Sequence, residues 1–124
     1  MAGLTFDTGA LIALERRRQR MRKVVDVATG EGVQITVPAV VLAEWWRGPG
    51  ELTTLIRAMF TVESTDESLA AVAGEAQARV TGATAVDAIV MASAARRGDV
   101  VYTSDFADLS NLARVFPNVR VLGV

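Results

Sequence analysis

The stretch Gly3-Leu4-Thr5-Phe6-Asp7-Thr8-Gly9-Ala10-Leu11-Ile12 decides the fold. Its first part, Gly3–Phe6, reads as a short strand, and Gly9–Arg22 has the pattern of a helix whose apolar residues precede a basic run. The rest of the chain repeats this alternation of strand and helix. We therefore predict an α/β fold, a three-layer sandwich with a mostly parallel central sheet flanked by helices.

The alternation of predicted strands and helices continues to the C-terminus. Val24–Ala28 continues the first helix, which stops near Gly30 and Gly32. Further strands are expected at Val33–Val37, Val100–Thr103 and Val119–Leu122, with an extended segment at Thr61–Ser64 and helices at Pro38–Arg47, Leu52–Phe60, Asp66–Val80, Thr84–Arg97 and Asp105–Val115. The Thr84–Arg97 helix is apolar on nearly every side, so we expect it to be central and buried. A length of 124 residues suits a single domain.

The composition excludes several classes of chemistry. The chain has no cysteine and no histidine, so it has no disulfide framework, no thiolate or ordinary zinc site, and no Ser-His or Cys-His catalytic group. Hydrophobic residues make up 51% of the chain, which leaves apolar surface for a partner. The sequence shows neither a signal-peptide pattern nor a long apolar run, so we expect no membrane span and a cytoplasmic location.

Four carboxylates stand at the edges of otherwise apolar segments: Asp7, Glu44, Asp87 and Asp105. Burying a lone ionised carboxylate is costly, so such groups are usually paired, hydrogen-bonded or bound to a metal. Oxygen ligands without nitrogen or sulfur favour Mg²⁺ or Mn²⁺. The sequence contains no phosphate-binding glycine loop, so it favours phosphodiester cleavage over nucleoside triphosphate binding.

The positions of these carboxylates suggest one shared site. Asp7 closes the first predicted strand and Asp105 follows the Val100–Thr103 strand, so both are expected at the edge where parallel sheets bind ligands. Glu44 and Asp87 lie on helices that could present their side chains there.

Each carboxylate also has a structural interpretation. Asp7 suits the N-cap of a helix, and the Asp105-x-x-Asp108 and Thr84-x-x-Asp87 spacings suit capping boxes. Glu44 follows Val40 and Val41 on one helix face, which disfavours a solvated position.

Taken together, these segments resemble the PIN-domain ribonucleases, specifically the VapC toxins of bacterial toxin–antitoxin pairs. The resemblance covers nearly the whole chain. The matching pieces are Phe6-Asp7-Thr8, Glu44, Val86-Asp87-Ala88-Ile89-Val90-Met91-Ala92, and Tyr102-Thr103-Ser104-Asp105-Phe106-Ala107-Asp108-Leu109.

The resemblance implies an endoribonuclease that hydrolyses RNA phosphodiesters with a metal-activated water. The acidic active-site set would be Asp7, Glu44, Asp87 and Asp105, and the metal set Asp7, Asp87, Asp105 and the accessory Asp108. Thr8 and Thr103 would support the site. The family motif often has serine two residues after the first aspartate, where this chain has Gly9, which leaves Thr8 as the nearest hydroxyl. The resemblance also implies a homodimer and a cognate VapB-type antitoxin.

Six of the thirteen cations lie within Arg16–Lys23. This basic run has the pattern of a solvated helix face or turn, and it could also contact RNA phosphates at the mouth of the site. Both can hold, because a solvated arginine cluster is free to bind RNA. The candidate RNA-binding residues are Arg16, Arg17, Arg18 and Arg20.

Trp45 and Trp46 are adjacent on a predicted helix and point about 100° apart. We therefore expect one to pack inside and the other to lie near a partner surface.

Two other classes of protein fit parts of the pattern. A receiver-type signalling domain also gathers aspartates around Mg²⁺, but it needs a lysine at the end of a late strand, and the only lysine here is Lys23. A catalytically inactive PIN-like domain that binds RNA or protein would keep the carboxylates as helix caps. Metal-dependent cleavage of a mixed RNA pool separates that alternative from the enzyme.

Overall fold

The computed structural model describes residues 2–124, which contain one five-stranded sheet. The strands are β1 (Leu4–Phe6), β2 (Ile35–Pro38), β3 (Thr61–Glu63), β4 (Val100–Thr103) and β5 (Arg120–Gly123). They lie in the order β3-β2-β1-β4-β5, and every neighbouring pair is parallel. The predicted α/β sandwich is confirmed, with a sheet that is parallel throughout.

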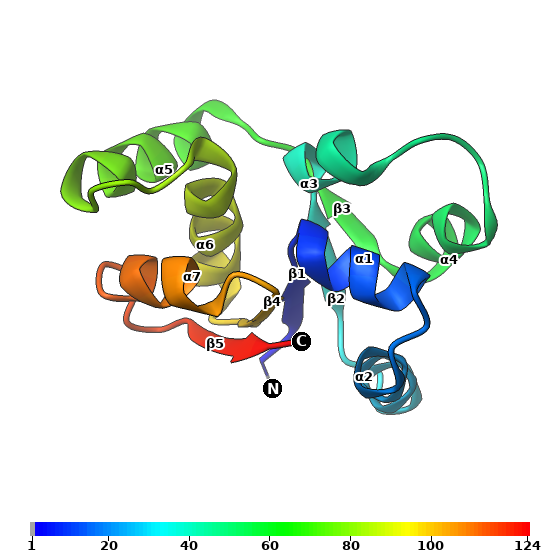
Figure 1. The fold of residues 1–124 in the computed structure, drawn as a ribbon. Coiled ribbons are helices and arrows are strands. Elements are labelled where there is room, and N and C mark those ends of the chain that lie inside the picture. Colours follow the sequence, from blue (N-terminus) through cyan, green and yellow to red (C-terminus); the bar gives the residue numbers. More distant parts are fainter. Residues whose placement is uncertain (1) are drawn as a thin grey trace.

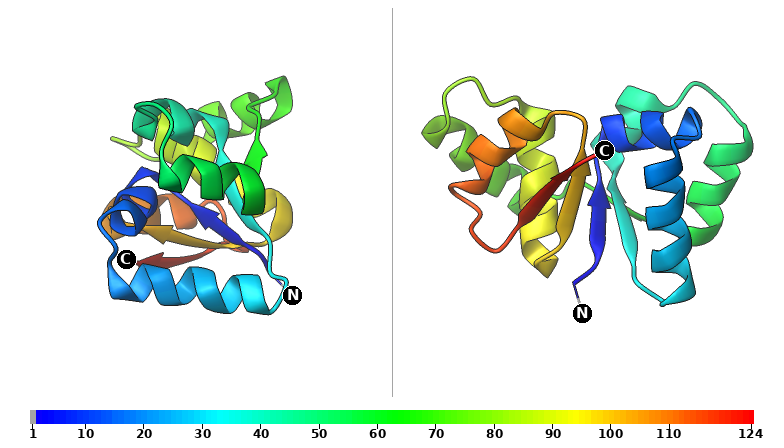
Figure 2. Two further views of the ribbon diagram at one scale, coloured as in Figure 1. Left: turned by 90° about the vertical axis from the view of Figure 1, so that its right-hand side faces the viewer. Right: turned by 60° about the horizontal axis from the view of Figure 1, so that its bottom comes forward.

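Seven helices within the same range cover the sheet. They are α1 (Thr8–Glu15), α2 (Gln19–Gly30), α3 (Ala39–Trp45), α4 (Glu51–Met59), α5 (Glu67–Arg79), α6 (Ala85–Arg97) and α7 (Phe106–Ala113). Helices α1, α2 and α4 lie on one side of the sheet and α5, α6 and α7 on the other (Figures 1 and 2). Parallel sheets need such cover because both of their faces are apolar. None of the helices described is both long and apolar enough to cross a membrane.

The core is centred on β1 and α6. Phe6 of β1 is fully buried, and its ring packs edge-on against Phe60 and Tyr102 with ring centroids 5.8 Å and 5.9 Å away. Val90 and Met91 of α6 are also fully buried, and this helix packs against β1, β2 and β4. The prediction that α6 is central and buried is confirmed.

The long N-terminal helix expected over residues 9–28 is wrong, because the structure divides it at Arg16–Arg18. Arg17 adopts a left-handed φ of 57°, a conformation that single residues adopt in turns and that a right-handed helix cannot contain. A single helix over Thr8–Gly30 would be about 35 Å long, whereas a four-residue strand spans only about 13 Å. The turn keeps α1 at the ends of the strands and lets α2 run back towards the start of β2.

A partly buried ion-pair network, in which Asp99 is fully buried, joins the end of α6 to the sheet. The guanidinium of Arg97 donates to Oδ2 of Asp99 at 2.8 Å, to Oε2 of Glu63 at 2.7 Å, to Oγ1 of Thr5 at 3.1 Å and to Oγ of Ser93 at 3.0 Å. One side chain thereby contacts β1 and β3 as well as its own helix. Removing one partner of a buried pair leaves an uncompensated charge, so this network fixes the position of α6.

Candidate active site

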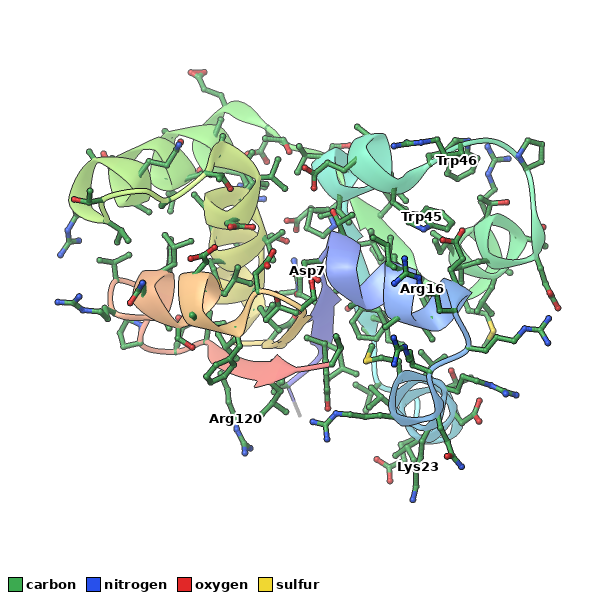
Figure 3. The ribbon with its side chains drawn as sticks, in the orientation of Figure 1. Asp7, Arg16, Lys23, Trp45, Trp46 and Arg120 are labelled. Atoms are coloured by element: carbon green, nitrogen blue, oxygen red, sulfur yellow. The ribbon has the colours of Figure 1, made fainter. Side chains whose placement is uncertain are left out.

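The ends of β1 and β4 meet where the strand order reverses. From β1 the chain proceeds through β2 to β3 on one side, whereas β4 is followed by β5 on the other. Ligands of open parallel sheets bind in the crevice at such a switch point. Asp7 directly follows β1 and Asp105 follows β4 by two residues, so both lie at this edge. Figure 3 shows Asp7 between the two groups of helices.

Asp7 is only 5% exposed, and both of its carboxylate oxygens accept hydrogen bonds. Oδ1 accepts from the N–H of Ala10 at 2.9 Å, which makes Asp7 the N-cap of α1. Oδ2 accepts from the hydroxyl of Thr103, whose Oγ1 in turn accepts from the N–H of Asp105 at 2.8 Å. The cap interpretation of Asp7 is therefore correct, and Thr103 links the ends of the two strands.

Thr8 and Glu44 join helices α1 and α3. The hydroxyl of Thr8, the first residue of α1, donates to Oε1 of Glu44 at 2.6 Å. Glu44 is exposed, so the expectation drawn from Val40 and Val41 is wrong. Helix α3 has only seven residues, and Glu44 stands one residue before its end, past the turn that holds the buried Val41. The Thr8 hydroxyl nevertheless holds one of its carboxylate oxygens.

The other acidic residues stand at the starts of α6 and α7. Thr84 caps α6 by accepting from the N–H of Asp87 at 3.1 Å, as its spacing predicted. Asp105 occupies the N-cap position of α7, but its side chain accepts no capping hydrogen bond, and Asp108 follows in the first turn. Both Asp105 and Asp108 are exposed. The cap interpretation of Asp105 is therefore wrong, and its carboxylate is available to a ligand.

The buried position of Asp7 disfavours its charged form. Burial raises the pKa of Asp7 from 3.8 to about 6, although the hydrogen bonds from Thr103 and Ala10 oppose the rise. The carboxylates of Asp105 and Asp87 raise this pKa further. Like charges act on one another in this way only at short range, so residues from three separate parts of the chain share one electrostatic environment.

The pKa of Asp87 is raised for similar reasons. Burial raises its pKa, the hydroxyl of Thr84 opposes the rise, and the carboxylates of Asp105, Asp108 and Glu44 add to it. Asp105 thus acts on both Asp7 and Asp87, which links the ends of β1 and β4 to the start of α6.

The donor set fits a hard divalent cation. Within residues 2–124 no three acidic side chains converge closely enough to form a ready-made coordination sphere, as expected for carboxylates that repel one another. Each oxygen of Asp7 accepts a single hydrogen bond and keeps a lone pair for a further ligand. The chain offers carboxylates and hydroxyls without histidine or cysteine, which suits Mg²⁺ or Mn²⁺.

Ser104 lies between Thr103 and Asp105, next to Gly9, and its pattern in the sequence did not predict this contact. A Cβ atom placed on Gly9 would lie 1.9 Å from Oγ and 2.5 Å from Cβ of Ser104. Ser104 therefore fills the space that a side chain at position 9 would occupy. The only signal in the sequence was the departure of Gly9 from the family motif, and it did not point to position 104.

All six cations of the basic run are exposed: Arg16, Arg17 and Arg18 form the turn between α1 and α2, and Arg20, Arg22 and Lys23 lie at the start of α2. Figure 3 shows Asp7 and Arg16 at opposite ends of α1, an eight-residue helix that is about 12 Å long. Arg17 also forms an exposed ion pair with Glu51, with Nη2 and Oε2 3.5 Å apart. The cations of the run are therefore exposed and begin about one length of α1 away from Asp7, and their contact with RNA stays a prediction.

The two tryptophans differ in exposure, as predicted. Trp45 is buried and lines a groove of about 900 Å³ that contains none of the acidic candidates. Trp46 is partly exposed, and the guanidinium of Arg57 lies 5.4 Å from the centre of its ring. This groove is thus separate from the acidic site.

Known proteins place the chain in a family. Its sequence matches the PIN domain over residues 4–115, so the chain belongs to the PIN domain family, and the resemblance seen in the sequence is confirmed. No curated protein sequence matches the chain.

Several solved structures share this fold. The chain is similar to DNA-bound VapBC from Salmonella typhimurium, with a TM-score of 0.73, 17% identity, and 99% of this chain and 98% of that chain covered. VapBC2 from Rickettsia felis, bound to a fragment of its promoter, has a TM-score of 0.73 at 10% identity, with 97% of each chain covered. FitAcB from Neisseria gonorrhoeae has a TM-score of 0.69 at 18% identity, with 96% of each chain covered.

Proposed function

We propose that this chain is a metal-dependent endoribonuclease and the toxin of a toxin–antitoxin pair, a VapC-type PIN domain that hydrolyses RNA phosphodiester bonds. The proposal depends chiefly on one observation: the buried Asp7 ends β1 and Asp105 follows β4 at the switch point of the sheet, and the carboxylates of Asp105 and Asp87 raise the pKa of Asp7. A buried carboxylate such as Asp7, with like charges beside it, is costly unless it serves a ligand. Membership of the PIN domain family supports the same conclusion.

The acidic residues would have different roles in the reaction. Asp7, Asp87 and Asp105 would hold Mg²⁺ or Mn²⁺, with Asp108 as an outer carboxylate. When bound, such a cation supplies an activated water and screens the charge that develops on the phosphate. Glu44 would orient that water.

Two hydroxyls would orient these carboxylates. Thr8 holds one oxygen of Glu44 and Thr103 holds one oxygen of Asp7. Attack by water leaves a 5′-phosphate and a 3′-hydroxyl. The chain has no histidine, so a route through two histidines to a cyclic phosphate is not available to it.

The proposed partners follow from the same assignment. Complexes named VapBC and FitAB are among the solved structures of this fold, and three of them contain DNA. We propose a VapB-type antitoxin as the inhibitor of this chain and a homodimer as its active form. An excess of apolar residues and the partly exposed Trp46 are consistent with such interfaces.

Cleavage of a mixed RNA pool tests the proposal. We expect cleavage by the wild type with Mg²⁺ or Mn²⁺ and none with excess chelator. Asp87→Asn and Asp105→Asn should each lose activity by about 100-fold or more while they remain folded. Glu75→Gln changes an exposed carboxylate on α5 and is the matched control. Full cleavage in chelator would refute the mechanism, and no cleavage by the wild type would favour the inactive PIN-like binding domain.

A further inference from the structure

Two acid-bearing segments come into close contact just beyond the sheet. The strand pairing of β1 with β4 ends at Phe6 and Tyr102, after which one chain enters α1 and the other turns towards α7. Ser104 lies in this turn, and it packs directly on the backbone of Gly9 in the first turn of α1. This contact lies two residues beyond Asp7 and one residue before Asp105.

The contact requires glycine at position 9. Rotation of the Ser104 side chain would move only its Oγ away from a Cβ atom added to Gly9. The Cβ of Ser104 would remain 2.5 Å and its backbone nitrogen 3.0 Å from that atom, whereas ordinary contacts are 3.4 Å or longer. A methyl group at position 9 therefore forces the turn to move by about 1 Å, because the atoms that clash belong to the turn itself.

We propose that the contact between Gly9 and Ser104 sets the spacing of the segments that carry Asp7 and Asp105. Gly9 and Ser104 are therefore positioning residues of the cation site. The inference rests on the proposed metal-dependent function. Ser104 acts here through its Cβ and backbone, which keep the turn against α1, and not through its hydroxyl. The hydrogen bond from Thr103 to Asp7 joins the same two segments one step earlier along the chain.

Calorimetric titration of the full chain with Mn²⁺ tests this role without RNA. Gly9→Ala should weaken Mn²⁺ binding by about 10- to 100-fold, the usual effect of displacing the groups that orient metal ligands. Gly74→Ala on α5 is the matched control, because a Cβ atom there meets nothing within 4 Å and alanine is the better helix former. Gly74→Ala should bind Mn²⁺ like the wild type.

Two further variants separate spacing from chemistry. Gly9→Ala combined with Ser104→Gly removes the Oγ and Cβ overlaps and leaves only the contact with the backbone nitrogen, so it should restore Mn²⁺ affinity to within a few-fold of the wild type. Ser104→Ala keeps the Cβ and should also bind like the wild type. If Gly9→Ala does not fold, rescue by the double variant decides the question.

The possible results separate failure of the positioning role from failure of the proposed function. Wild-type Mn²⁺ affinity in a folded Gly9→Ala variant, or failure of the double variant to recover, would overturn the positioning role while leaving the proposed function intact. Loss of affinity in Ser104→Ala would also overturn it, because the hydroxyl would then be the active part. Absence of Mn²⁺ binding in the wild type would overturn both proposals.

Discussion

Replacing Asp7 with asparagine should stabilise the metal-free protein while abolishing its activity. Asp7 is almost fully buried, and Asp87 and Asp105 add their negative charges to its surroundings. The proposed function requires this carboxylate, whereas folding would be easier without its charge. Such a trade of stability for activity is expected at a site built to bind a cation.

The size of the effect follows from the pKa of Asp7. It is raised from 3.8 to about 6, so folding favours the protonated form. The stability that this contributes is fully present below about pH 4 and is lost as the pH rises through about 6. A difference of about 2 in pKa corresponds to about 3 kcal/mol of lost stability in the wild type near pH 8.

Asparagine should recover most of this loss. Its side-chain oxygen can still accept from Ala10 N–H and preserve the cap of α1, but the amide replaces the oxygen that accepts from Thr103. Allowing about 1 kcal/mol for the weaker hydrogen bond leaves a gain of about 2 kcal/mol near pH 8. For a chain of 124 residues this raises the melting temperature by about 8 °C.

Calorimetric melting in chelator near pH 8 and near pH 5 measures this gain. The advantage of Asp7→Asn should be largest near pH 8 and should shrink near pH 5, where Asp7 of the wild type is already largely protonated. Asp26→Asn changes an exposed aspartate on α2 and should alter neither melting curve by more than about 2 °C. A variant less stable than the wild type near pH 8, or a gain independent of pH, would refute the reasoning.

Three further predictions concern the surroundings of the site. Thr8→Val removes the hydroxyl that donates to Glu44, so steady-state kinetics should show kcat lowered by about 10-fold. The free energy of unfolding should stay within about 0.5 kcal/mol of the wild type. An unchanged kcat would show that Glu44 needs no such support. Replacing Arg17, Arg18 and Arg20 with glutamine should flatten the salt dependence of RNA binding without moving the cleavage position, and an unchanged slope would show that these residues form only a solvated surface. Light scattering at tens of micromolar should give the mass of a homodimer, and a strict monomer would contradict that assignment.

Most of the fold follows from local patterns in the sequence. The strands are short apolar runs, and the starts of α5 and α6 follow from the capping residues Asp66 and Thr84, which the structure confirms. The break between α1 and α2 is different, because no glycine or proline marks it. It arises from the size of the sheet, a tertiary constraint that periodicity within residues 9–28 does not contain.

The same distinction applies to the site. The sequence places Asp7 and Asp105 at one sheet edge because they follow strands, and the structure places both there. The sequence does not show that Glu44 is exposed, because this exposure depends on where α3 ends. It also does not reveal that Ser104 fills the space over Gly9, because residues 95 positions apart meet only through the pairing of β1 with β4. The partners of Arg97 are hidden for the same reason.

Crystals of the wild type soaked in Mn²⁺ would test the central claim most directly, because anomalous scattering locates the ion without reference to activity. We predict a peak bounded by carboxylate oxygens of Asp7, Asp87 and Asp105, with metal–oxygen distances of about 2.1 Å, and no such peak in Asp87→Asn crystals. A peak elsewhere on the molecule, or none at this edge of the sheet at millimolar Mn²⁺, would contradict the account.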